Sequence, residues 1–81
     1  DKLVAIAFRA SGPSGHTLFV RTSRNGGRSF AGLVPLFSTN RAEGIGVPAV
    51  AIGDGVMTVA WTDRASGEVK VRTSRTEGRR F

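Results

Sequence analysis

The 81-residue sequence contains no cysteine, no tyrosine and only one histidine. The absence of cysteine excludes disulfide bonds and cysteine-ligated metal sites. The single histidine, His16, lies in a stretch rich in serine and glycine and makes neither a metal site nor a catalytic triad, so we expect no function for it. We also expect no metal and no cofactor. No run is long and apolar enough to cross a membrane, and no stretch of ~10 residues has helical spacing.

The charged residues are unbalanced toward arginine, because ten arginines and two lysines face six acidic residues and give a net charge of +6. A basic chain indicates acidic partners, such as sialylated glycans, other polyanions or nucleic acid. Nucleic acid is the weakest of these, because aromatic side chains interleaved with basic ones are missing. Half a dozen arginines recur in two matched sets, which we interpret as surface residues of a repeat: Arg21, Arg24, Arg28, Arg72, Arg75 and Arg79.

A twelve-residue segment occurs twice, at residues 19–30 and 70–81, with eight identical positions at an offset of 51. The similarity extends upstream, where residues 1–8 match 54–61 in residue character. A period of about 50 residues is typical of solenoids, propellers and arrays. The repeat therefore predicts an architecture before any single-site chemistry.

Short apolar or alternating runs separated by turn residues predict six strands. Two of them are apolar throughout and suit strands covered on both faces, and two alternate and suit half-exposed strands. The prolines of the remaining two are tolerated at an edge or at a strand start. In chain order the expected strands are 3–8, 17–23, 33–37, 48–52, 56–61 and 69–74.

Turn residues set the order of these strands, because 53–55 is a tight hairpin signal and Asn25-Gly26-Gly27 supplies positive φ angles. A four-stranded antiparallel sheet that repeats in this way is the blade of a β-propeller. Residues 1–38 would supply the second to fourth strands of one blade, and 47–81 the first to third strands of the next. Residues 39–46 would connect them. The expected fold is thus all-β, with consecutive four-stranded blades of which about one and a half are present.

The turn segment 23–30, Ser-Arg-Asn-Gly-Gly-Arg-Ser-Phe, resembles the Asp-box, or bacterial neuraminidase repeat, with the pattern Ser/Thr-x-Asp-x-Gly-x-x-Trp/Phe. Segment 74–81 is a degraded second copy. The resemblance implies a sialidase-like β-propeller with both boxes on one rim. The structural box positions are Ser23, Asn25, Gly27, Phe30, Ser74, Thr76, Gly78 and Phe81.

Each box residue has a physical role in this interpretation. The serine hydroxyl and the Asx side chain bond turn amides, the glycines allow a left-handed backbone, and Phe30 and Phe81 cap the core, so both should be buried. Asn25 and Thr76 stand where the family has Asp. Because Thr makes such a turn more weakly than Asn, we expect the second hairpin to be the looser.

Similar boxes occur in sialidases, other glycoside hydrolases, sorting receptors and non-enzymatic propellers, and they resemble structural staples more than catalysts. Family sialidases use a tyrosine nucleophile, which is absent here, so the chain is not catalytic by itself. We therefore expect a structural repeat segment whose parent is an exo-sialidase or a related glycoside hydrolase. The alternative is a non-enzymatic propeller that binds a glycan or a protein through its loop rim. The expected partners are the remaining blades and acidic glycans, with no membrane partner.

The lack of an initiator methionine and of a signal peptide suggests that any targeting segment lies outside these residues. We expect a secreted or cell-surface location, with the bacterial cytoplasm as the alternative.

Candidate site residues lie in three predicted long loops, 9–16, 38–46 and 62–68, at the rim opposite the boxes. Three arginines could bind a carboxylate in bidentate fashion: Arg9, Arg41 and Arg64. Asp63 and Glu43 could act as acid or base. Taken singly, each of these is more readily interpreted as an ordinary solvated loop charge. Trp61 is the counterpart of Phe8 and is expected in the core rather than as a sugar platform, and 12–15 is expected to be a flexible turn rather than a phosphate loop.

Overall fold

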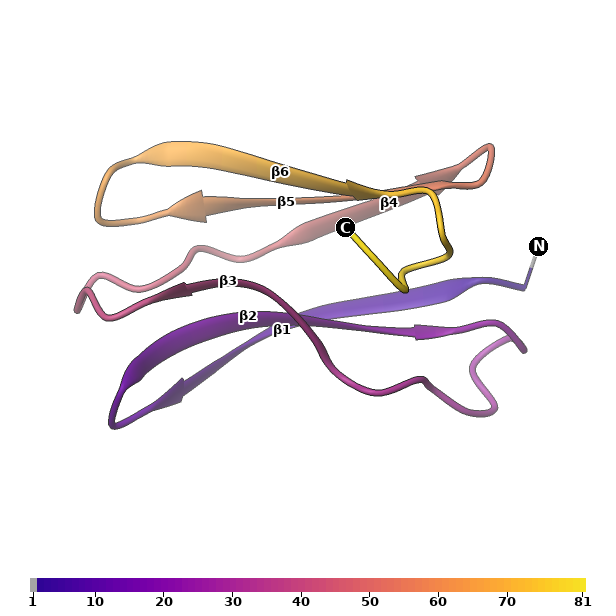
Figure 1. Ribbon diagram of the computed structural model, residues 1–81. Coiled ribbons are helices and arrows are strands. Elements are labelled where there is room, and N and C mark those ends of the chain that lie inside the picture. The colour runs from indigo at the N-terminus through magenta and orange to yellow at the C-terminus, as the bar shows by residue number, and fades with distance from the viewer. Residues whose placement is uncertain (1) are drawn as a thin grey trace.

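The computed structural model describes residues 2–81, which form six strands and no helix (Figure 1). In chain order the strands are β1 (Val4–Gly12), β2 (Gly15–Ser23), β3 (Val34–Thr39), β4 (Ala49–Gly53), β5 (Val56–Asp63) and β6 (Glu68–Ser74). They make two three-stranded antiparallel sheets with the orders β1-β2-β3 and β4-β5-β6. The all-β prediction is confirmed. Within residues 2–81 there is no helix that could span a membrane. Asp1, the first residue of the predicted segment 1–38, lies outside the described residues.

Two of the predicted long loops are largely strand. β1 and β2 pair as far as Gly12 opposite Gly15, so most of 9–16 is hairpin. β5 and β6 pair as far as Asp63 opposite Glu68, which leaves 64–67 as the turn. The sequence prediction ended these strands at Phe8 and Trp61, where the apolar runs stop. Antiparallel pairing nevertheless satisfies their backbone groups, and Gly15, with φ of 130°, allows the tight closure.

The core lies between the two sheets, which Figure 1 shows one above the other. Leu18 and Val20 of β2 face Met57, Val59 and Trp61 of β5, and all five are at most 3% exposed. Leu36 and Ile45 complete this buried cluster, and the Phe37 ring lies 5.6 Å from the Trp61 ring. Trp61 is therefore a core residue, as the sequence predicts.

The outer faces of both sheets are uncovered in the described chain. On the first sheet Ile6 is 47% exposed, and Phe8 and Phe19 pair across the strands with their ring centroids 5.7 Å apart. On the second sheet Val69 is 69% and Val71 54% exposed. Apolar side chains in these positions are unusual for the solvent side of a small β protein, where polar residues normally alternate with the core residues.

The prediction that Phe30 and Phe81 are buried is wrong. Both are only partly buried, and of the two only Phe81 packs against the core cluster. The physical reason is the position of the two turns. The turn that ends at Phe81 folds back toward the first sheet, whereas no sheet of the described chain lies beside the turn that ends at Phe30 (Figure 1).

The two box turns lie at the same end of the strands, together with the β4–β5 turn (Figure 1). The β1–β2 turn, the β5–β6 turn and the β3–β4 connection lie at the opposite end. A direct contact ties the box turns together, since Arg24 Nη1 lies 3.2 Å from Glu77 Oε1. The molecule thus has a box end and a connection end, each with its own polar site.

Candidate functional site

At the box end, a serine hydroxyl holds the turn after β2. Ser23 Oγ accepts hydrogen bonds from the backbone N–H of Gly27 at 2.9 Å and of Asn25 at 3.3 Å, and donates to Asn25 Oδ1 at 2.7 Å. The same Oδ1 accepts from the N–H of Ser29 at 3.0 Å, while Asn25 Nδ2 donates to Ser29 Oγ. Two side chains therefore satisfy three turn amides that would otherwise have no partner.

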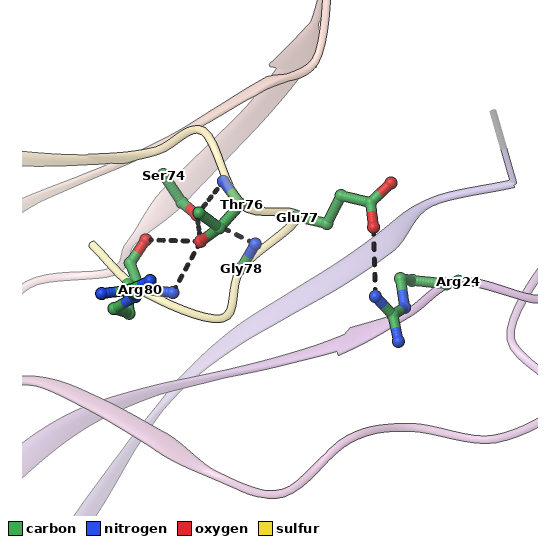
Figure 2. A network of polar contacts seen from close by, with 6 residues as sticks. All are labelled: Arg24, Ser74, Thr76, Glu77, Gly78 and Arg80. Atoms are coloured by element: carbon green, nitrogen blue, oxygen red, sulfur yellow. Dashed lines mark hydrogen bonds and ion pairs between the residues drawn. The ribbon is translucent and has the colours of Figure 1, made fainter.

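The turn after β6 repeats this network (Figure 2). Ser74 Oγ accepts from the N–H of Gly78 at 2.9 Å and of Thr76 at 3.2 Å. Thr76 Oγ1 accepts from the N–H of Arg80 at 2.9 Å and lies 3.3 Å from the Arg80 carbonyl oxygen. The bond that Thr76 Oγ1 accepts from Arg80 is as short as its Asn25 counterpart, but the contact between Ser74 Oγ and Thr76 Oγ1 is 3.2 Å long, against 2.7 Å between Ser23 Oγ and Asn25 Oδ1. The second turn is therefore looser at the serine contact and not at the amide bond. A threonine hydroxyl reaches the same amide as an Asx oxygen.

The two turns differ in backbone conformation at one position. Gly26 in the first turn has φ of 75°, and Glu77, the matching residue in the second, has φ of 58°. A left-handed conformation costs a residue with a Cβ roughly 1–2 kcal/mol. The ion pair between Glu77 and Arg24 offsets little of this, because both side chains are about half exposed and such pairs contribute ~0.2–1 kcal/mol.

Gly78 joins the second turn to the first sheet. A Cβ on Gly78 would lie 2.5 Å from Thr22 Cγ2 and 2.9 Å from Thr22 Oγ1, whereas a Cβ on Gly27 would meet nothing within 4 Å. Gly78 has φ of 86°, so it needs glycine both for its backbone and for close approach. The second box is thus packed against β2, and the first has an open side.

Two of the repeated arginines do more than cover the surface. Arg21 Nε donates to the Ala31 carbonyl oxygen at 3.0 Å, and Arg72 Nη2 donates to the Phe81 carbonyl oxygen at 3.2 Å. Each side chain thus connects the strand that precedes a box turn to the backbone at the end of that turn. Their recurrence in the sequence was the available signal, but recurrence alone does not distinguish a clamp from surface charge.

At the connection end, a hollow of about 330 Å³ lies between the two sheets. Its walls come from β1, β2, the β3–β4 connection and the β5–β6 turn: Arg9, Ser11, His16, Glu43, Gly44, Ile45 and Arg64. The lining residues include two arginines, one histidine and one glutamate. The hollow is at the small end of the range of ligand pockets, which runs from ~300 to 1,000 Å³.

Hydrogen bonds fix the walls of this hollow. Arg9 Nη1 donates to the Ile45 carbonyl oxygen at 2.9 Å, which ties β1 to the β3–β4 connection. The N–H of Arg64 donates to the Gly44 carbonyl oxygen at 3.2 Å, which ties the β5–β6 turn to the same connection. The single bond used by Arg9 leaves its other N–H donors available to a ligand.

The structure brings together Arg9, Arg64 and Glu43 from the predicted site residues and leaves out the other two. Arg41 does not line the hollow. Asp63 Oδ1 accepts from the N–H of Ala65 at 3.2 Å, so this carboxylate shapes the β5–β6 turn.

Sequence reasoning missed His16, for which it expected no role. Its Nδ1 lies 2.7 Å from Ser11 Oγ. Its ring lies over Gly44, where a Cβ would be 3.4 Å from three ring atoms. Nothing near His16 in the sequence indicates this, because Gly44 is far away along the chain. Residues 2–81 contain no group of three His, Cys, Asp or Glu side chains that could hold a metal ion.

Comparison with family models, characterised proteins and solved structures found no match for this chain.

Proposed function

We propose that the chain is a structural repeat segment of a sialidase-like Asp-box β-propeller, with about one and a half four-stranded blades. The observation that supports this proposal is the repetition of one hydrogen-bond network in two turns that follow matching strands, at an offset of 51 residues. The parent of such a segment is an exo-sialidase or a related glycoside hydrolase, and the remaining blades are its partners.

In this role the boxes act as staples, and the opposite end carries recognition. The serine hydroxyls fix the turns without a ligand or a metal, because the turn amides are satisfied within the chain. Rigid strands then hold the connections that surround the hollow, and binding residues commonly lie on such connections.

The staple role can be tested by amide hydrogen exchange on the 81-residue chain. The amides of Gly27, Ser29, Gly78 and Arg80 should be protected. Ser23→Ala should expose those of the first turn and Ser74→Ala those of the second. The loss should be roughly 0.5–1.5 kcal/mol in the first turn, where Gly27 and Ser29 are exposed, and roughly 1–3 kcal/mol in the second, where Gly78 is buried. Ser14→Ala, in the exposed β1–β2 turn, is the matched control. Free exchange of these amides in the unaltered chain would remove the support for an Asp-box.

The second candidate is a non-enzymatic propeller that binds an acidic glycan at the connection end. The hollow favours it, because Arg9 and Arg64 come from different sheets and line the same space. Guanidinium groups match carboxylates geometrically and bind them in bidentate fashion.

Titration with sialyllactose, followed by amide NMR, tests this candidate, with lactose as the neutral control. Signals of Arg9, Gly44 and Arg64 should shift with sialyllactose only, and Arg64→Ala should abolish the shift. Arg75→Ala, at the box end, should leave it intact. Equal shifts with lactose would exclude carboxylate recognition.

A further inference from the structure

Residues on the covered face of each sheet have their repeat counterparts on the uncovered face of the other sheet. By the repeat, Leu18, Val20 and Thr22 of β2 match Val69, Val71 and Thr73 of β6. The first three are at most 6% exposed, because Leu18 and Val20 pack in the core cluster with β5 and Thr22 lies against Gly78. The last three lie on the outer face of the second sheet, and all three are exposed.

The same correspondence holds for the strands that do the covering. Met57, Val59 and Trp61 of β5 pack on β2, and the upstream repeat match places Val4, Ile6 and Phe8 of β1 in their positions. These β1 residues lie on the outer face of the first sheet, where Ile6 pairs with Arg21 and Phe8 with Phe19.

The box turns repeat the relationship. Gly78 packs on Thr22, and its counterpart Gly27 has an open side. The counterpart of Thr22 is Thr73, which is exposed on β6. The outer face of the first sheet therefore has residues like those with which β5 covers β2. The outer face of the second sheet has residues like those of β2 that are covered.

We propose that, in the 81-residue chain, where no further blade of the proposed propeller covers them, these two faces bind each other between copies. The face of Val4, Ile6 and Phe8, here called the β1 face, covers the face of Val69, Val71 and Thr73, the β6 face, of a second copy. The contact reproduces the β2–β5 interface within the chain, with Gly27 of one copy against Thr73 of the other. It joins different surfaces, so it is heterologous and head-to-tail, and it leads to a ring or an open chain.

This contact is weaker than the one within the chain for two structural reasons. The internal interface is supplemented by Leu36 of β3, and no fourth strand in residues 2–81 supplies its counterpart beside β6. The Arg24–Glu77 ion pair is also lost, since Gly26 stands where the partner carboxylate would be. Association should therefore depend on concentration rather than be obligate.

Sedimentation velocity on the 81-residue chain over a wide concentration range tests the proposal. The unaltered chain should shift to larger species as its concentration rises. Ile6→Asp, on the β1 face, and Val71→Asp, on the β6 face, should each remain monomeric at concentrations where the unaltered chain associates. Both positions are about half exposed, so the fold should survive, and far-ultraviolet circular dichroism checks that it does.

Mixing the two variants provides the decisive measurement. The Ile6→Asp copy keeps its β6 face and the Val71→Asp copy keeps its β1 face, so an equimolar mixture should form a dimer and nothing larger. Val47→Asp is the matched control, because Val47 is 77% exposed and lies on neither face, and it should associate like the unaltered chain.

Three results would overturn the proposal: an unaltered chain that stays monomeric at the highest concentration, a mixture of variants that stays monomeric, or an equal loss of association in Val47→Asp. None of them bears on the staples, which are measured by hydrogen exchange. A failure of the self-association proposal is thus distinguishable from a failure of the proposed function.

Discussion

Gly78 packs against Thr22 so closely that a Cβ on the glycine would lie 2.5 Å from the threonine Cγ2. Thr22 belongs to the first copy of the repeated segment and Gly78 to the second. Their contact joins the second box turn to the first sheet. A comparison with Gly27, the matching glycine with open space around it, separates the backbone demand of the turn from the demand of the contact.

Gly27→Ala should cost about 1–2 kcal/mol, because alanine is forced to a positive φ. Gly78→Ala should cost a further ~1–3 kcal/mol, because the methyl group overlaps Thr22. Chemical denaturation measures both. Thr22→Ala should recover part of the extra cost in the Gly78→Ala background and none in the Gly27→Ala background. Equal costs at the two glycines would show that the Thr22 contact is not tight.

Gly27→Val should destabilise the chain by roughly 1–3 kcal/mol, because a β-branched residue tolerates the left-handed region poorly. Gly32→Val is a control without a positive φ or a nearby atom, and it should have a much smaller effect. An unchanged denaturation midpoint for Gly27→Val would show that the first turn does not have the inferred conformation.

Asn25→Asp should be neutral or slightly stabilising. The carboxylate keeps the acceptor for the Ser29 N–H and can accept from the Ser29 hydroxyl, and it gains attraction from Arg24 and Arg28. Asn25→Ala should lose about 0.5–1.5 kcal/mol, because it removes the side-chain hydrogen bond to the exposed Ser29 amide. Thermal unfolding at low and high salt compares them. A large loss for Asn25→Asp would mean that the Nδ2 donor, not Oδ1, holds the turn.

Arg24→Ala should cost less than about 1 kcal/mol, and salt should remove the difference, because the ion pair with Glu77 is exposed. Glu77→Gly loses the same pair and releases ~1–2 kcal/mol of backbone cost, partly offset by a more flexible unfolded chain. It should therefore be no less stable than Arg24→Ala. A clearly less stable Glu77→Gly variant would contradict the strain at this position.

The chain alone should not hydrolyse a fluorogenic sialoside, because it contains no tyrosine to act as the nucleophile that sialidases use. Turnover above background that persists through purification and is lost in Asp63→Ala would contradict this expectation. A Ser14→Ala preparation made in parallel controls for contaminating enzymes.

The strands and turns could be predicted because their signals are local. Alternation predicts β2 and β6, and the serine and glycine spacing predicts both box turns. The lengths of the hairpins could not be predicted from the sequence. Ser11 and Thr62 extend their strands only because a partner strand pairs with them. The hollow could not be predicted either, because Arg9, Glu43 and Arg64 meet only through the packing of two sheets. The predicted burial of Phe30 and Phe81 was wrong, because burial at these positions depends on which neighbouring sheets are present.

Because the box staples hold the turns with serine, asparagine and threonine side chains, the surface charge at the box end can be changed without changing the turns. Ser23, Ser74 and their i+2 partners use side-chain atoms to hold the turns. Most of the arginines at that end are exposed and are not part of the staple networks: Arg24, Arg28, Arg75 and Arg79. The charge of +6 can thus be lowered or reversed there, one residue at a time, while the turn geometry is retained. Substitution of these arginines can therefore change the solubility of the chain and its nonspecific adsorption to polyanions while the fold stays the same.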